Sequence, residues 1–271
     1  MDALTSLSRF FRPVQPRFRE GGADVVYQEL APDALLSGYL CCYWQLESVR
    51  PLSSPFLYNA VADGCIDLFF DMDQPEENFV MGFSSGYTSF ALENSFRYAG
   101  IRFFPGAFPL LYNIKASELT NQCQYISAVT PRAYQALKDL MTNPSGIAGI
   151  RSQLDQYFKK LVFSKEASID LRFAESLGTI LQAGGIVNIE KDISASVSPR
   201  HLRRLFDFYV GAAPKEFNKI VRFQKLLGGN ITRDSLKKDK LYYDAGYYDQ
   251  SHFIRDFKAL YGIPPLKALA P

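Results

Sequence analysis

The 271-residue sequence has no long hydrophobic run, only two histidines and only four cysteines. Its apolar stretches fall far short of the roughly 20 residues that a membrane-spanning helix needs. Four arginines and two prolines interrupt residues 1–20, which therefore lack the apolar core of a signal peptide. With 47% hydrophobic and 21% charged residues, the composition excludes the disordered and fibrous classes. We expect a cytoplasmic protein with one large domain or two ordinary ones.

The scarce cysteines and histidines do not form the pattern of a metal site. The cysteines are Cys41, Cys42, Cys65 and Cys123. Their spacing is not that of metal ligands, and adjacent cysteines are poor disulfide partners, which favours a reduced compartment. His201 and His252 have no accompanying cysteine or third histidine, so a helix-surface role is favoured over metal ligation. Because no phosphate-binding loop or dinucleotide fingerprint is present either, we expect no metal and no cofactor.

The first half of the chain has the pattern of β-strands. Runs rich in aromatic and β-branched residues, separated by Gly, Pro, Asp and Asn, predict strands at residues 39–46, 65–70, 79–83, 87–92 and 96–104. Strands at this density are typical of a small sandwich or barrel. Helical spacing of apolar residues then appears at 131–141 and 147–161, and again throughout the chain beyond residue 168.

These patterns predict an α+β fold with two domains. A mainly-β, sandwich- or barrel-like domain with trailing helices would occupy residues 1–162, and an all-α domain residues 168–271. Charge divides in a similar way, because residues 1–186 hold 15 Lys and Arg against 19 Asp and Glu, whereas residues 187–271 hold 15 against 9. The C-terminal excess of positive charge points to a polyanionic partner, unless it only solvates a basic face.

A repeat with an offset of 51 residues is the strongest internal signal. Five identical pairs carry it, namely His201 and His252, Arg204 and Arg255, Phe206 and Phe257, Gly211 and Gly262, and Pro214 and Pro265. Ser198 and Asp249 are good N-caps ahead of the two copies, and an apolar stripe follows each cap. A helix-like stretch at residues 214–227 lies between them. The repeat therefore predicts two copies of one helical unit.

The polar face of each repeated helix carries side chains that suit DNA bases. It holds Arg200, His201, Arg203 and Arg204 in the first copy, and Gln250, Ser251, His252, Ile254 and Arg255 in the second. Arginine pairs with guanine edges and glutamine with adenine. A capped helix after a short helix and a turn, here at residues 195–197 and 245–248, is the arrangement of a helix-turn-helix. The alternative is a plain helical bundle whose arginines only face solvent.

Three stretches resemble the DNA-binding domain of AraC/XylS-type transcriptional regulators. They are SPRHLRRLF with GAAPKEF (198–217), VRFQKLL (221–227), and GYYDQSHFIRDFK with GIPP (246–265). The resemblance implies a bacterial DNA-binding transcription regulator, not an enzyme. Its two helix-turn-helix units would span about 187–213 and 236–264, joined by a helix at about 214–228, and would read successive major grooves. The base contacts that it implies are Arg200, Arg203, Arg204, Gln250, Ser251, His252 and Arg255.

The first half resembles a regulatory domain that often precedes such DNA-binding pairs. The resemblance rests on YW (43–44), ADGCIDLFF (62–70), MG (81–82) and GIRFFPGAF (100–108). It implies sensing or oligomerisation, with a small-molecule effector, a homodimer and the transcription machinery as candidate partners beside double-stranded DNA. Arg102 and Trp44 are the candidate ligand-binding residues, because an arginine among strand aromatics must be paired or face a cavity or solvent. A salt bridge with a nearby acid is the competing role for Arg102.

Several features leave alternatives open. Tyr242 stands where the family has a small residue, so its phenol would overpack a helix contact unless the neighbours adjust. Lys191 and Asp192 occupy usually apolar or small positions, which indicates a shifted helix and a less secure base-reading role for the first unit. The acids Asp63, Asp67, Asp71 and Asp73 fit strand and turn positions better than acid–base catalysis. The alternative function is a small-molecule-binding protein or an enzyme whose helical C-terminal part is structural.

Overall fold

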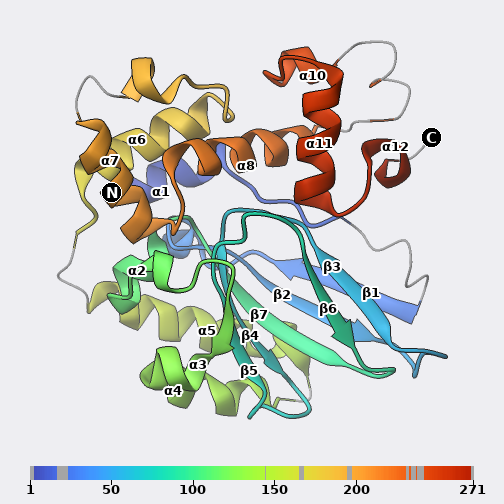
Figure 1. The fold of residues 1–271 in the computed structure, drawn as a ribbon. Helices are drawn as coiled ribbons and strands as arrows, with labels where there is room; N and C mark the ends of the chain where they lie inside the picture. The colour runs from blue at the N-terminus through green and yellow to red at the C-terminus, as the bar shows by residue number, and fades with distance from the viewer. Residues whose placement is uncertain are drawn as a thin grey trace.

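The computed structural model describes residues 3–16, 24–143, 145–164, 168–193, 197–229, 232, 236 and 241–269. Within these ranges a β-rich N-terminal part is followed by a helical C-terminal part, which confirms the predicted α+β fold with two domains. Figure 1 shows the strands in a lower layer and the C-terminal helices packed above them. No helix in the described ranges is long and apolar enough to cross a membrane.

Two antiparallel sheets form the β part. The larger has the order β1 (Val25–Leu30), β2 (Leu40–Ser48), β7 (Arg97–Phe103), β4 (Ile66–Asp71), β5 (Asn78–Met81) and β8 (Cys123–Tyr125). The smaller pairs β3 (Phe56–Ala60) with β6 (Thr88–Leu92). The five predicted strands correspond to β2, β4, β5, β6 and β7, whereas β1, β3 and β8 were missed. Both β1 and β8 are edge strands with mostly exposed or half-buried side chains, so they show little apolar alternation.

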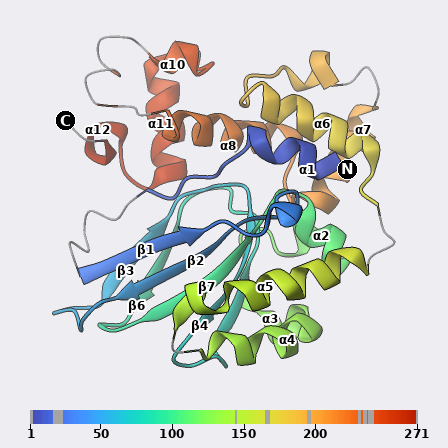
Figure 2. The same cartoon turned by 180° about the vertical axis from the view of Figure 1, so that it is seen from behind.

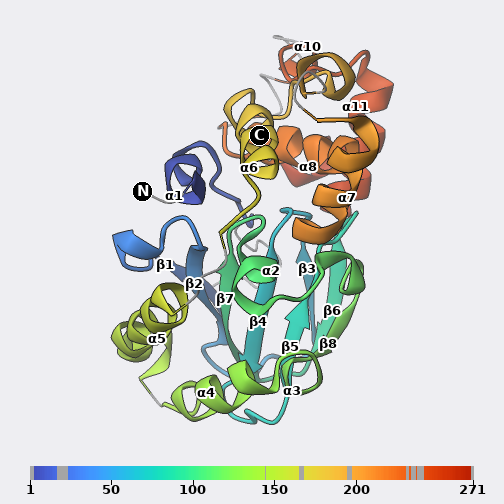
Figure 3. The ribbon, with the colours of Figure 1, turned by 90° about the vertical axis from the view of Figure 1, so that its left-hand side faces the viewer.

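Successive side chains of the large sheet point to opposite faces. Ile101 and Phe103 of β7 join a buried cluster with the helices that follow the strands, α2 (Ala107–Tyr112), α4 (Pro131–Met141) and α5 (Gly146–Phe163). Helix α4 has the predicted bounds, and α5 extends the predicted 147–161 by one residue at its start and two at its end. Arg102 lies between Ile101 and Phe103 in β7, so its side chain is on the other face of the sheet, toward β3 and β6. Figure 3 shows the order of the layers as α5, large sheet and small sheet.

The helical part contains the two repeated helices and the helix between them. Its elements are α6 (Leu171–Gln182), the π-type turn η5 (Ile189–Ile193), α7 (Pro199–Tyr209), α8 (Pro214–Leu227), α10 (Leu241–Asp244), α11 (Gln250–Tyr261) and α12 (Pro265–Ala268). Helix α8 has the bounds predicted for the stretch between the repeats, because Pro214 opens it and Gly228 ends it. Most of the predicted first turn, at 195–197, lies outside the described residues.

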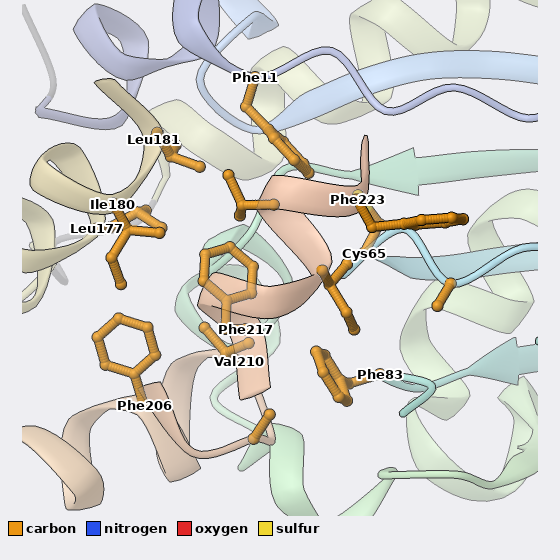
Figure 4. Packing of buried hydrophobic residues seen from close by; sticks show 14 of the residues in the cluster. Phe11, Cys65, Phe83, Leu177, Ile180, Leu181, Phe206, Val210, Phe217 and Phe223 are labelled. Carbon is orange, nitrogen blue, oxygen red and sulfur yellow. The ribbon is translucent and has the colours of Figure 1, made fainter. Parts of the chain in front are cut away.

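The N-terminal segment packs between the C-terminal helices and the β part, where Phe11 also contacts Phe104 at 6.3 Å between ring centroids. Figure 2 shows α1 (Ala3–Leu7) beside α6. A few residues later Phe11 contacts the ring of Phe217 in α8, with 6.4 Å between ring centroids. Figure 4 shows the cluster to which both belong, and Cys65 and Phe83 of the β part also take part in it. One hydrophobic core therefore crosses from the β part into the helices.

Candidate nucleic-acid interface

Helix α7 begins with a side-chain cap and a proline. The hydroxyl of Ser198 accepts a hydrogen bond from the backbone N–H of His201 at 3.4 Å, and Pro199 occupies the first turn. Ser at the N-cap and Pro at the first helical position each favour helix initiation. Leu202 and Phe206 are buried against the core, which leaves the opposite face of α7 to solvent.

Three of the predicted DNA contacts lie on this exposed face of α7, namely Arg200, Arg203 and Arg204. The Nη2 of Arg204 is 2.9 Å from the Nδ1 of His201. Because guanidinium groups only donate, the imidazole accepts this bond. The Arg204 side chain is therefore bonded to His201 on the surface of α7, whereas Arg200 and Arg203 are exposed to solvent.

Helix α11 repeats the construction of α7. An Asp249 carboxylate oxygen accepts from the backbone N–H of His252 at 2.7 Å, which caps the helix as predicted. The preceding turn contains Gly246 at φ 73°, a left-handed conformation that glycine adopts without strain. Gln250, Ser251 and Arg255 are exposed on α11, as the base-reading prediction requires.

His252 differs from the other predicted contacts, since it also belongs to a charged cluster between α8 and α11. Its Nε2 is 3.4 Å from Oδ2 of Asp256, and its ring packs edge-on against Tyr247 at 5.4 Å between centroids. Lys219 and Arg222 of α8 approach the same carboxylate at 3.8 and 3.9 Å. The side chain of His252 is 42% exposed, so only part of it is available to a partner.

Arg222 is a positioning residue that the sequence reasoning missed. Its guanidinium lies over the Tyr247 ring, 4.3 Å from the centroid, and its Nη1 donates to the carbonyl oxygen of Gly246 at 3.1 Å. These contacts fasten the turn before α11 to α8. The residue that could have pointed to Arg222 is Asp256, because an acid on the buried side of α11 needs a cationic partner.

The C-terminal ends of both repeated helices contact the β part. After α7, the hydroxyl of Thr120 donates to the carbonyl oxygen of Gly211 at 2.6 Å. At the end of α11, the carbonyl oxygen of Leu260 accepts from the N–H of Ala62 at 3.1 Å. Figure 1 shows both helices running toward the sheet. Their N-terminal halves, which carry the exposed polar side chains, therefore lie away from the β part.

The positions that depart from the family pattern are accommodated without a clash. Tyr242 is buried, and its ring stacks on that of Phe253 with an interplanar angle of 22°. Lys191 and Asp192 are exposed on η5, while Ile189 and Ile193 are buried in their place. Tyr242 is thus part of the packed core, and Ile189 and Ile193 supply the buried side of η5.

Arg102 and Trp44 meet at one end of a cavity between the two sheets. The Nε of Arg102 lies 3.1 Å from Asp63 and 3.2 Å from Asp67, and its Nη1 is 3.4 Å from Glu29. The indole Nε1 of Trp44 donates to Asp67 at 2.7 Å. The predicted salt bridge of Arg102 is confirmed, and both candidate ligand-binding residues line the cavity.

The four acids that stood out in the sequence separate into two groups. Asp63 and Asp67 belong to the Arg102 cluster, and burial raises the pKa of Asp67 to about 6. Asp71 accepts hydrogen bonds from the backbone N–H groups of Asp73 and Gln74 in the β4–β5 turn. Asp73 pairs with Arg97 on the surface at 2.6 Å. Strand and turn roles thus account for Asp71 and Asp73.

Two known families match parts of the chain. Residues 194–270 match a helix-turn-helix domain of the AraC type, and residues 28–124 match a domain of unknown function, DUF6597. No curated protein and no solved structure matches. The helix-turn-helix match covers both repeated helices, α7 and α11, and the helix between them. The chain therefore has an AraC-type helix-turn-helix domain preceded by an N-terminal domain, and this arrangement supports a DNA-binding regulator of the AraC type in general.

Proposed function

We propose that the protein is a sequence-specific transcription regulator that reads two adjacent major grooves with α7 and α11. The observation that carries this proposal is the repeated arrangement of two capped helices, each with exposed polar side chains in its N-terminal half. Helix-turn-helix proteins present base-reading side chains from this part of the recognition helix. Helix α8 joins the two units with a stiff 14-residue connection.

Direct base reading is assigned to the exposed arginines and to Gln250. Arg200 and Arg203 of α7 and Arg255 of α11 suit guanine, and Gln250 suits adenine. Ser251 is short and can serve either base. Arg204 and His252 already have partners within the protein, His201 and Asp256. We therefore assign each of them two roles, a contact to a base or phosphate and an intramolecular contact that stabilises its helix.

The division of the chain into residues 1–162 and 168–271 belongs to this proposal. The first part would sense an effector or form a homodimer, and the second would bind DNA. The two parts are not loosely linked, because the cluster around Phe217 includes Cys65 and Phe83. A conformational change in the first part can therefore reach α7 and α11 through packed side chains.

The experiment is a mobility-shift titration of the full chain with the DNA upstream of its own coding sequence. A scrambled duplex of the same composition is the control, and both are measured at several salt concentrations. Specific binding should exceed non-specific binding by about 10³-fold or more. Footprinting should show protection of two grooves on one face of DNA, about one helical turn apart. Equal affinity for both duplexes would refute the regulator proposal, and a single protected groove would refute the two-helix version.

A further inference from the structure

The cavity between the two sheets is large enough for a small molecule and has two different ends. Its volume is about 420 Å³, within the range of about 300–1,000 Å³ that is usual for small-molecule sites. Six aromatic side chains take part in its lining, namely Trp44, Tyr58, Phe69, Phe79, Phe90 and Tyr98. The charged end is formed by Arg102, Asp63 and Asp67.

The charged end carries more negative than positive charge. Arg102 is the one cation in the described part of this cluster, and it faces Asp63, Asp67 and the half-buried Glu29. Its charge is therefore already compensated, and an anionic ligand would add repulsion from two nearly buried carboxylates. A cationic ligand group would instead balance the excess and would face aromatic rings, whose π-faces attract cations.

The cluster also has an unused hydrogen-bond donor. Arg102 is 4% exposed, and its Nε and Nη1 have the acceptors given above. Its Nη2 has no acceptor among the residues that the structure describes. This nitrogen is not one of the fully buried atoms that lack a partner, and Arg102 lines the cavity, so a molecule in the cavity can reach it. A ligand oxygen near the ammonium group would accept a hydrogen bond from it.

We propose that this cavity binds a small organic cation, an aromatic amine that carries a hydroxyl or similar uncharged oxygen beside its ammonium group. The ammonium group lies against Asp67, the oxygen accepts from Arg102, and the aromatic body fills the space lined by Phe69 and Phe90. The proposal concerns the N-terminal domain alone, so it does not depend on how the helical domain reads DNA.

Three probes with one skeleton test the sign of the ligand charge. They are 2-amino-1-phenylethanol, 1-phenyl-1,2-ethanediol and mandelate, which share the ring and the benzylic hydroxyl and differ in a cationic, neutral or anionic end group. Binding to the full chain without DNA is followed by thermal shift and by the fluorescence of Trp44, the only tryptophan. A ligand that binds only the folded state raises the melting temperature by mass action.

The cationic probe should bind about tenfold more tightly than the diol, as expected for a hydrogen bond to a charged group, and mandelate should not bind. Asp67→Asn should remove the preference for the amine, whereas Asp73→Asn, which removes an exposed acid outside the cavity, should leave it unchanged. Ala60→Leu narrows the cavity without changing the charge of its lining. It should therefore weaken the binding of both the amine and the diol. If Asp67→Asn does not fold, Glu29→Gln should reduce the same preference.

Each alternative result overturns the proposal in a different way. Mandelate binding as tightly as the amine would show that Arg102 dominates the cluster. An amine preference that survives Asp67→Asn would place the cation elsewhere. Absence of any shift at a probe concentration of about 10 mM, which would place the dissociation constant above the millimolar range, would refute a cavity for ligands of this size. DNA binding by the same sample, measured separately, keeps these outcomes distinct from those for the proposed function.

Discussion

The side-chain amide of Gln224 in α8 donates a hydrogen bond to the carbonyl oxygen of Ala62 at 2.8 Å. The same amide accepts a hydrogen bond from the backbone N–H of Val14 at 2.7 Å. Gln15, the next residue, donates to Asp63 in the Arg102 cluster at 2.9 Å. One buried glutamine thus joins the N-terminal segment, the β part and the helix between the two repeated helices.

Gln224→Ala should destabilise the whole chain by about 1–3 kcal/mol, because it leaves the Ala62 carbonyl and the Val14 N–H without their partner. Urea unfolding measures the loss. Lys225→Ala, at an exposed neighbouring position, is the matched control and should change stability little. A wild-type unfolding curve for Gln224→Ala would mean that water replaces both bonds at no cost.

Arg255→Ala should weaken binding to the correct operator by about 1–3 kcal/mol and relax preference at one base pair. Arg255 is exposed on α11. Titration of cognate and scrambled duplexes at several salt concentrations measures the effect, with Lys258→Ala on the same helix as control. A uniform loss on both duplexes, with the slope of log K against log salt reduced by about 0.9, would identify a phosphate contact instead. A lower melting temperature without DNA would identify a structural role.

The stability contribution of Asp67 should depend on pH between about 4 and 6. Burial raises the pKa of Asp67 to about 6, so the folded state holds this proton more tightly than the unfolded chain, where the pKa is about 3.9. The stabilisation is therefore complete below about pH 4 and is lost as the pH rises through about 6. From pH 4 to 8, wild type should lose about 2–3 kcal/mol relative to Asp67→Asn. Urea unfolding of both chains at each pH checks this, and a constant difference would contradict it.

Gly100→Ala should disrupt the wall of the cavity. A Cβ at Gly100 would lie 2.4 Å from the Trp44 ring and 2.8 Å from the carbonyl oxygen of Leu68, closer than atoms can pack. We expect a loss of about 1–3 kcal/mol and a changed emission of Trp44. Gly229→Ala has more room around it, with no atom nearer than 3.3 Å, and is the control. Equal effects of the two substitutions would show that the sheet adapts to the added methyl group.

The sequence predicted elements best where local chemistry marks both ends. Helix α4 has its predicted bounds because Pro131 opens it and the Asn143 turn follows it, and Pro214 does the same for α8. Edge strand β1 was missed because its exposed side chains follow no strict alternation. Pairings between distant segments leave no local trace, so the docking of Phe11 on Phe217 could not be anticipated.

For the site residues, too, local features could be predicted from the sequence and long-range packing could not. The caps at Ser198 and Asp249 are local signals, and they predicted correctly where α7 and α11 begin. Trp44 and Arg102 were the candidate ligand-binding residues from the sequence, but the cavity that they line depends on the separation of two sheets. That separation is a property of tertiary packing, since β3 lies beside β6 and not beside its neighbour β2.

The packing of α1 on α6 has a consequence for the order in which the chain folds during synthesis. Residues 3–7 leave the ribosome long before residues 171–182, so Leu4 and Leu7 lack the helical part of their packing surface while the β part is being made. The β part can form its sheets in that interval, but the side of α1 that packs on α6 stays uncovered until α6 has been synthesised. A fusion partner attached ahead of α1 would therefore already be present when α6 packs on α1.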